Sequence, residues 1–293
     1  MPINATAKIW MDGELVDWDD AKIHILNPTL HYGWGVFEGI RAYATDRGPA
    51  VFRLKEHIDR LYASARAINL DIGMAHADMM ALVEEAVKKS GLRDAYIRPL
   101  ITRGVGDLGI DPINCKRPTI MVIVDTIKIW PEERYEQGLA CVTAPTPIPH
   151  RESLSPRVKS LNYLPHVMAK IEGRVAGADE VLMLDASGHV CEGSGQNLFI
   201  VNGRTLRTPP SYAGILLGVT RNAVMEIATQ AGYAVKEELF NRYDIYTADE
   251  AFLTGTASEV APIRSLDGRA IGTGKPGPVT RDLMTKFRAL VRD

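Results

Sequence analysis

The sequence predicts an α/β protein in which short strands, hairpins and amphipathic helices alternate along the chain. Three observations support this fold class. Apolar residues recur at helical spacing in several segments, runs rich in Val, Ile and Leu are bounded by Gly, Asn and Pro, and 293 residues with 46% hydrophobic content can form one large or two ordinary domains. We expect a small N-terminal domain at 1–126, a connection at 127–136 and a larger C-terminal domain at 137–293.

Composition and charge favour a small-molecule function. The formal net charge is -2, so nothing in the composition supports binding to nucleic acid or to an anionic membrane. The N-terminus lacks an apolar leader segment and no stretch reaches the length of a membrane span, which predicts a cytoplasmic protein. Three cysteines are too few for a disulfide framework, and no Cys or His pair has metal-ligand spacing, so we expect no metal.

The N-terminal part is expected to combine strands with two helices. The expected elements are a hairpin at 8–16, strands at 22–25 and 50–52, helices at 54–68 and 77–90, and strands at 95–102 and 119–125. The second helix is predicted to bury Met80, Val83 and Val87. Tyr96 and Arg98 share one face of their strand, and an arginine between apolar residues either points at solvent or needs an anion.

Two glycine-rich segments need an interpretation. Gly33, Gly35 and Gly39 lie among aromatic residues in 31–43, which fits either a pocket wall or a core strand with bulges. Gly104-Val-Gly106-Asp-Leu-Gly109 matches the dinucleotide-binding fingerprint, but no amphipathic helix can be drawn through the residues after it. We therefore interpret 104–112 as a surface loop.

The C-terminal part begins with a strand at 138–143 and a proline-fixed path up to Pro156. A helix follows Lys159, and its apolar stripe consists of Leu164, Val167, Met168, Ile171 and Val175. The remaining expected elements are strands at 181–184 and 190–192, a hairpin at 197–208, a helix at 219–229, a strand at 251–254 and a helix at 279–291.

Two ionisable residues are candidates for chemistry. Lys159 stands in an apolar, proline-fixed setting four residues before Tyr163, and such surroundings lower an amine pKa and permit Schiff-base chemistry. Glu192 ends a strand that reads as buried, where a carboxylate needs a partner such as a protonated pyridine nitrogen. The alternatives are a solvated surface lysine and a hydrogen-bonded core glutamate.

Two backbone features are candidates for an anion site. Gly218 opens the helix that begins Val219-Thr220-Arg221, and Gly255-Thr256 forms a turn, so both offer free N–H groups beside a hydroxyl. Arg60 is a candidate for the full positive charge. A phosphate is the natural guest of such a site.

Together these residues resemble the class IV aminotransferases. Glu192-Gly-Ser-Gly-Gln-Asn197-Leu-Phe, Leu206-Arg-Thr208 and Leu216-Leu-Gly218-Val-Thr-Arg221 are similar to the family signature across its whole length. The segments 31–41, 96–100 and 255–264 resemble the branched-chain amino-acid aminotransferases of that family. The resemblance implies pyridoxal 5'-phosphate (PLP), a homodimer or higher homo-oligomer, and the fold type IV architecture: a small α/β domain, a larger α/β pseudo-barrel domain, and the cofactor between them.

The resemblance also implies a role for individual residues. Lys159 is the expected Schiff-base lysine and general acid/base, Glu192 the partner of the pyridine nitrogen, and Tyr163 the partner of the cofactor's 3'-oxygen. The expected phosphate ligands are Arg60, Val219, Thr220 and Thr256, with Leu216 under the ring. The expected substrate pocket consists of Tyr32, Phe37, Gly39, Tyr96, Arg98, Thr256 and Ala257. Trp130 is the one aromatic candidate for a lid in the interdomain connection, and the 104–112 loop is expected to reach the neighbouring subunit's site.

The expected activity is ping-pong transamination of L-leucine, L-isoleucine and L-valine with 2-oxoglutarate. Within the same fold, D-amino-acid aminotransferase, (R)-amine aminotransferase and aminodeoxychorismate lyase are alternatives, because they share the lysine and the glutamate. A non-catalytic nucleotide-binding α/β protein that uses the Gly104 loop is the alternative from a different class.

Overall fold

The computed structural model describes residues 8–293, which form two compact units. Unit 1 contains the chain up to Ile127 together with Val158–Asn162 and Arg292–Asp293. Unit 2 contains Lys128–Arg157 and Tyr163–Val291. The short segment that carries Lys159 is therefore part of unit 1, although its neighbours in sequence belong to unit 2.

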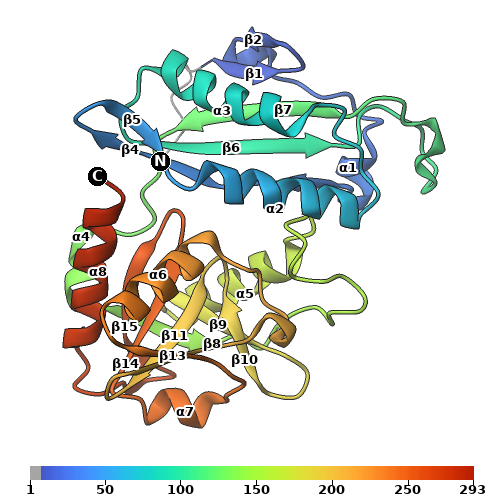
Figure 1. Ribbon diagram of the computed structural model, residues 1–293. Coiled ribbons are helices and arrows are strands. Elements are labelled where there is room, and N and C mark those ends of the chain that lie inside the picture. Colours follow the sequence, from blue (N-terminus) through green and yellow to red (C-terminus); the bar gives the residue numbers. More distant parts are fainter. Residues whose placement is uncertain (1–7) are drawn as a thin grey trace. The chain divides into compact units, whose positions relative to one another are not determined.

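Among the described residues, unit 1 contains a seven-stranded antiparallel sheet with the order β2-β1-β7-β6-β4-β5, and β3 pairs with β6 (Figure 1). Its strands are β1 (Ile9–Met11), β2 (Glu14–Val16), β3 (Gly35–Phe37), β4 (Ile40–Thr45), β5 (Gly48–Val51), β6 (Ala95–Thr102) and β7 (Thr119–Asp125). Its helices are η1 (Trp18–Asp20), α1 (Pro28–Tyr32), α2 (Leu54–Ala67), α3 (His76–Ser90) and η2 (Pro112–Asn114).

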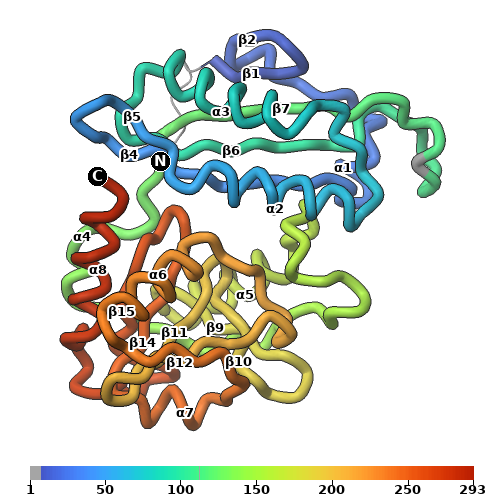
Figure 2. The backbone as a smooth tube through the Cα atoms, in the orientation of Figure 1, coloured from blue at the N-terminus to red at the C-terminus, as the bar shows by residue number. Residues whose placement is uncertain are grey.

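The core of unit 1 lies between the sheet and the helices α2 and α3, which run alongside it in Figure 2. The helix predicted at 54–68 is confirmed as α2, and its Ile58 and Leu61 side chains are fully buried. In α3 the prediction is confirmed for Val83 and Val87, which are buried, and is wrong for Met80. Met79 is fully buried and Met80 is half-buried, because Met79 shares the helix face of Val83 and Val87.

The strand predicted at 22–25 is wrong. Residues 21–24 have no strand pairing, and the Ile25 side chain is 71% exposed. Alternating apolar residues form a strand only where a neighbouring strand bonds their backbone, and none pairs with this segment. The chain instead enters α1, whose first turn is capped by the Asn27 side chain accepting from Thr29 N.

Unit 2 contains, in its described residues, a nine-stranded sheet with the order β10-β9-β8-β15-β14-β11-β12-β13, and β16 pairs with β15. A further pairing of β10 with β11 closes six of these strands into a barrel. The strands are β8 (Leu139–Thr143), β9 (Glu180–Leu184), β10 (Val190–Gly193), β11 (Asn197–Asn202), β12 (Thr205–Thr208), β13 (Ala234–Glu237), β14 (Glu250–Gly255), β15 (Glu259–Leu266) and β16 (Arg269–Ala270).

The helices of unit 2 surround this barrel-like sheet, with α6 against β14 and α8 against β15 (Figure 1). They are α4 (Glu132–Gln137), α5 (Leu164–Val175), α6 (Val219–Gln230), α7 (Arg242–Tyr246) and α8 (Pro278–Leu290), with η3 at Ser211–Ala213. None of the helices in residues 8–293 combines the length and apolar character needed to cross a membrane.

The apolar stripe expected on α5 exists, but it does not face the core of its unit. Leu164, Val167, Met168, Ile171 and Val175 are 40% to 84% exposed. The buried face consists of His166, Ala169 and Gly173. A Cβ atom at Gly173 would lie 2.4 Å from Val181 Cγ1 on β9, so the helix lies too close to the sheet for large side chains on that face.

Candidate active site

The backbone of Lys159 is fixed in unit 1 by hydrogen bonds on both of its sides. Phe37 N donates to Lys159 O (3.1 Å), and Leu161 N donates to Gly35 O (2.9 Å), so the segment runs antiparallel to β3. Lys159 N donates to Ser64 Oγ on α2 (3.1 Å). The lysine is thus held between a strand and a helix, although it follows a long loop in sequence.

The side chain of Lys159 belongs to a cluster of predicted site residues. Its Nζ lies 4.4 Å from the centroid of the Phe37 ring, and the Arg98 guanidinium lies 4.8 Å from the same centroid. Arg98 Nη2 donates to the Tyr96 hydroxyl (2.8 Å). A Cβ atom at Gly39 would lie 2.2 Å from that hydroxyl, so only glycine fits there. Unit 1 therefore brings five of the predicted residues together.

Arg60 on α2 binds a buried carboxylate that the sequence analysis did not single out. Its Nε and Nη2 donate to Oε1 and Oε2 of Glu38 at 2.6 and 2.8 Å, and His57 Nδ1 lies 2.8 Å from Oε2. Burial alone would raise the pKa of Glu38, but the Arg60 charge and the hydrogen bonds from Arg60 and His57 hold it well below its usual range. Burial lowers the pKa of His57 despite Glu38. Glu38 therefore stays ionised and orients Arg60.

Tyr32 is a predicted substrate-pocket residue of unit 1 that does not belong to the cluster around Lys159. It ends α1, and its hydroxyl donates to Leu108 O in the 104–112 loop (2.7 Å). Its side chain is 41% exposed. Among the described residues no hydrogen bond or ring contact joins it to Phe37 or Tyr96, so the structure links it to the loop instead.

In unit 2, Glu192 lies on β10 and is 5% exposed. Its Oε2 accepts hydrogen bonds from Leu216 N (2.9 Å) and Asn197 Nδ2 (3.3 Å). His166 Nε2 lies 3.5 Å from Oε1, and the His166 ring stacks on Tyr163 with centroids 4.5 Å apart. The structure thus brings together three predicted residues, Tyr163, Glu192 and Leu216, with two that were not predicted.

The first turn of α6 lies against this group. Val219 and Thr220 are buried, and no side-chain hydrogen bond caps the helix at Gly218. A Cβ atom at Gly218 would lie 2.0 Å from Asn197 Oδ1, so the close approach requires glycine. Asn197 Nδ2 also donates to Leu216 O (2.8 Å). Asn197 therefore joins the Glu192 carboxylate to the positive end of α6.

Thr256 and Ala257 form the turn between β14 and β15, where Gly255 pairs with Glu259. Two buried hydroxyl oxygens flank this turn, Thr254 Oγ1 and Ser258 Oγ, and neither has a hydrogen-bond partner among the described residues. Buried hydroxyls normally have partners, so this end of the barrel can donate to an anion.

Sequence reasoning missed Glu38, His57, His166 and Asn197 as site residues. Two signals pointed to them. Glu38 is a lone charge in an otherwise apolar strand region, and His57 lies three residues after Leu54, on the apolar face of α2. Asn197 belongs to the signature motif but had no role assigned. His166 had no signal beyond its place in the helix that follows the lysine.

Trp130 does not form a lid in unit 2. Its side chain is 7% exposed, belongs to the core of that unit, and its Nε1 donates to Asp179 O (3.4 Å). The one aromatic candidate for a lid in the connection therefore packs into the core of unit 2. An aromatic residue in a connection between two domains can pack into the core of either domain, and the sequence alone does not show which one.

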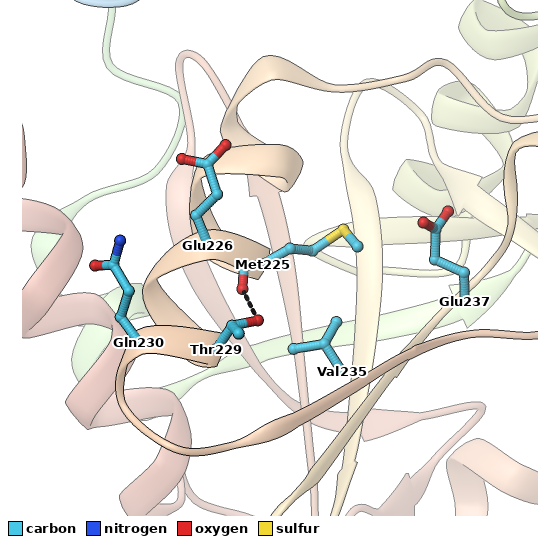
Figure 3. Close-up of a pocket in the computed structure, with 6 residues that line it drawn as sticks. All are labelled: Met225, Glu226, Thr229, Gln230, Val235 and Glu237. Atoms are coloured by element: carbon cyan, nitrogen blue, oxygen red, sulfur yellow. Dashed lines mark hydrogen bonds between the residues drawn. The ribbon is translucent and has the colours of Figure 1, made fainter.

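A surface hollow of about 500 Å³ lies between α6 and β13 (Figure 3). Met225, Val235 and the carboxylate-bearing Glu226 and Glu237 line it. None of the predicted site residues lines it, and its two carboxylates do not suit a phosphate. Among residues 8–293, no cluster of His, Cys, Asp and Glu is arranged to hold a metal ion.

The comparison with known families identifies the class of protein. The amino-transferase class IV family model matches residues 35–266, and the chain belongs to this family. The predicted family and the fold type IV α/β class are confirmed. The alternative of a non-catalytic nucleotide-binding protein is wrong, and the residues after Gly109 form only the short η2.

Similar proteins within the family carry a more specific name. A "putative branched-chain-amino-acid aminotransferase" of Methanocaldococcus jannaschii is 46% identical over 96% of this chain and 95% of its own length. The branched-chain-amino-acid aminotransferase of Pseudomonas aeruginosa is 42% identical, over 97% of this chain and 92% of its own. The crystal structure of the Escherichia coli branched-chain amino acid aminotransferase matches with a TM-score of 0.95 at 36% identity, covering 98% of this chain and 95% of that chain. The PLP form of the branched-chain amino acid aminotransferase from Thermobaculum terrenum gives a TM-score of 0.90 at 30% identity, covering 100% of this chain and 96% of that chain.

Proposed function

We propose that this chain is a PLP-dependent aminotransferase that transfers the amino group of L-leucine, L-isoleucine and L-valine to 2-oxoglutarate by a ping-pong reaction. The names of its similar relatives support this substrate class. The observation that carries the proposal is the arrangement in unit 2. There Asn197 lies between the buried Glu192 carboxylate and the first turn of α6, which no side chain caps.

This arrangement fits the two charged ends of PLP. A pyridinium nitrogen needs a buried carboxylate, and Glu192 Oε1 has only His166 Nε2 as a polar neighbour among the described residues. A phosphate needs N–H and hydroxyl donors, which the first turn of α6 provides at Val219 and Thr220. Thr256 lies beside two buried hydroxyls without partners, and Arg60 provides a guanidinium oriented by Glu38. Each unit therefore offers groups that fit the cofactor, and Leu216 would be a contact of its ring.

Bound PLP supplies an electrophilic aldehyde and a ring that takes up the electron pair released when the amino acid loses its α-proton. Lys159 Nζ provides the amine that attaches the cofactor and afterwards carries the α-proton. Its fixed backbone and the Phe37 ring restrict where that amine can reach. Glu192 would keep the ring nitrogen protonated, and Tyr163 would donate to the cofactor's 3'-oxygen.

The substrate pocket in this proposal uses Tyr32, Phe37, Gly39, Tyr96 and Arg98, with Thr256 and Ala257 from the β14–β15 turn. Arg98 has a buried Nε without a hydrogen-bond partner among the described residues. An unpaired guanidinium N–H is costly to bury, and a substrate carboxylate would satisfy it. The Phe37 ring gives the same pocket an apolar surface for a branched side chain.

We also propose that the chain functions as a homodimer or larger homo-oligomer in the cytoplasm. Leu164, Val167, Met168, Ile171 and Val175 form a continuous exposed apolar stripe on α5, as expected of a surface covered by a partner. Val105, Leu108, Ile110 and Ile113 are also exposed, so the 104–112 loop has an apolar tip suited to a second subunit. The three cysteines are free and buried, as in proteins of reducing compartments. The domain boundaries at 1–126, 127–136 and 137–293 are part of this proposal.

A half-reaction series tests the assignment. The PLP-loaded protein is mixed separately with L-leucine, L-glutamate, D-alanine and (R)-1-phenylethylamine, and the visible absorption band of the cofactor is followed. We expect L-leucine to react at least about a hundredfold faster than D-alanine, or about 2.7 kcal/mol of differential transition-state binding. A faster reaction with D-alanine or the amine would refute the branched-chain assignment, and a protein that never acquires the band would refute the PLP assignment.

A further inference from the structure

His166 is the one ionisable residue on the buried face of α5. It lies in the first turn of the helix, is 8% exposed, and shares that face with Ala169 and Gly173. Its Nε2 lies 3.5 Å from Glu192 Oε1, and its ring stacks on Tyr163 at an interplanar angle of 25°. A single imidazole thus contacts both a carboxylate and a phenol ring.

The surroundings decide where the proton of this imidazole lies. A nitrogen that faces a carboxylate oxygen must carry the hydrogen, since two lone pairs would repel each other. Nδ1 is buried and has no hydrogen-bond partner among the described residues. An Nδ1–H in that position would lose its hydrogen bond to water without replacement. The neutral ring with its single proton on Nε2 satisfies both conditions.

The Glu192 carboxylate needs such a contact because its two oxygens are held differently. Oε2 accepts hydrogen bonds from Leu216 N and Asn197 Nδ2. In the described residues, Oε1 has only His166 Nε2 as a polar neighbour. Because the two oxygens of a carboxylate rotate together, the bonds to Oε2 set the plane of the group, and His166 Nε2 is the polar group that faces its other oxygen.

We propose that His166 is a positioning residue that acts through Glu192: its Nε2–H, 3.5 Å from Oε1, helps to hold that oxygen for the cofactor's ring nitrogen, while its ring supports Tyr163. This inference rests on the proposed function, because it assigns Glu192 and Tyr163 to the cofactor ring. A core histidine without such a role would have partners unrelated to the site. Here the charged contact and the ring contact of His166 are both with predicted cofactor contacts.

Two variants separate the Glu192 contact from the Tyr163 stacking. His166→Gln keeps an amide N–H at the distance of Nε2 and removes the ring, whereas His166→Phe keeps the ring and removes the N–H. We expect His166→Phe to weaken PLP binding to the apoprotein roughly tenfold, because the N–H that faces the Glu192 charge is lost. His166→Gln should stay within about threefold of the parent.

The readout beyond activity is the ¹⁵N chemical shift of the ring nitrogen in ¹⁵N-labelled PLP. We expect this signal to move in His166→Phe and to keep the parent value in His166→Gln. In the half-reaction with L-leucine, His166→Phe should lower the maximal rate and leave the half-saturating concentration unchanged, because Glu192 acts on the ring and not on the substrate. An unchanged signal and affinity in His166→Phe, or equal losses in both variants, would overturn the proposal.

A measurement on the parent apoprotein needs no folded His166→Phe variant. Histidine ¹⁵N–¹H correlation spectra distinguish the two tautomers, and the signals missing from His166→Gln identify His166. A proton on Nε2 supports the proposal, and a proton on Nδ1 with bare Nε2 overturns it. Because this test requires no cofactor, it remains decisive if the parent fails to bind PLP, an outcome that would refute the proposed function itself.

Discussion

The guanidinium of Arg60 forms a two-pronged ion pair with the buried carboxylate of Glu38, with Nε 2.6 Å from Oε1 and Nη2 2.8 Å from Oε2. Glu38 follows β3, and Arg60 lies in the middle of α2. The pair therefore joins the strand that holds the Lys159 backbone to the helix whose Ser64 accepts from Lys159 N. The two parallel hydrogen bonds of such an ion pair fix the orientation of the guanidinium as well as the position of its charge.

Glu38→Gln should destabilise the apoprotein strongly. The amide has a single acceptor oxygen, so it can accept only one of the two hydrogen bonds from Arg60, and the largely buried guanidinium loses the charge of Glu38. We therefore expect the free energy of unfolding to fall by about 3 kcal/mol. Urea denaturation measures the change. Glu85→Gln is the control, since its carboxylate pairs with Lys89 on the exposed side of α3 and should leave stability almost unchanged. A Glu38→Gln protein as stable as this control would contradict the importance of the pair.

Stability should fall with acidification in two steps. The pKa of His57 is lowered by burial, so the unfolded state binds its proton first, and stability declines as the pH falls below the ordinary value of 6.5. Burial alone would raise the pKa of Glu38. It is nevertheless lowered, by the Arg60 charge, by the hydrogen bonds from Arg60 and His57, and by the His57 charge. The contribution of the Glu38 carboxylate to stability is therefore complete above pH 4.5 and declines as the pH falls toward its lowered pKa. Lys159 is the further charge facing His57.

The melting temperature of the apoprotein between about pH 8 and about pH 3 measures this dependence, because this range covers the first step and the beginning of the second. His57→Asn retains an N–H donor for Glu38 and cannot titrate. In the pH range of the first step, the melting temperature of His57→Asn should therefore vary less than that of the parent. Identical profiles for the two proteins would assign the first step to other histidines.

Lys159→Ala should bind PLP without forming a covalent link. Borohydride reduction followed by peptide mass analysis should place the cofactor on the Lys159 peptide in the parent and on no peptide in the variant, because the attaching amine is absent. Lys89→Ala, on the exposed side of α3, is the control and should keep the label. Ordinary turnover by Lys159→Ala would exclude this lysine from the reaction.

Most of the elements that the sequence predicted bury their apolar face within their own unit, and α5 is the exception. The helices α2, α6 and α8 begin and end within a residue of the predicted bounds, and the predicted β11–β12 hairpin forms, with Asn202 paired to Thr205 across the turn Gly203-Arg204. Both helical periodicity and a two-residue turn are local properties. The Lys159 and Glu192 motifs were recognisable for the same reason, since each is a short contiguous stretch.

Features that depend on distant contacts could not be predicted in this way. Glu38 and Arg60 are 22 residues apart, and neither sequence neighbourhood specifies the other. The stripe on α5 shows the complementary limit. Periodicity finds an apolar face but does not say what covers it, and here Gly173 lies against β9 while the larger residues remain exposed.

The α5 stripe leads to a prediction about assembly. Replacing Val167 and Ile171 together by lysine places two charges in the middle of the stripe, which would be costly to bury in an interface. We expect sedimentation to show a smaller species than the parent, with unchanged far-UV circular dichroism. Arg174→Ser, an exposed change on the same helix outside the stripe, is the control. An unchanged sedimentation coefficient in the double variant would remove α5 from the subunit interface.

The final prediction concerns Glu192, for which a structural and a functional role predict different outcomes. If Glu192 serves only as a hydrogen-bonded core residue, Glu192→Gln keeps its shape and most of its bonds with Leu216 and Asn197. The cost would then be a modest loss of stability with near-normal turnover. If its negative charge instead keeps the cofactor's ring nitrogen protonated, the amide cannot hold that proton equally well.

Attachment of the cofactor to Lys159 should survive in Glu192→Gln, because it needs only the amine and the aldehyde. Proton abstraction from L-leucine should slow by at least about a hundredfold, or about 2.7 kcal/mol of transition-state stabilisation. The half-reaction is measured at saturating PLP beside the melting temperature. Glu180→Gln serves as a matched control, since it removes another buried carboxylate of the same barrel, one that binds Lys170 and Ser194. A folded, PLP-loaded Glu192→Gln within about tenfold of the parent, a barrier change under about 1.4 kcal/mol, would show that Glu192 is not the partner of the ring nitrogen.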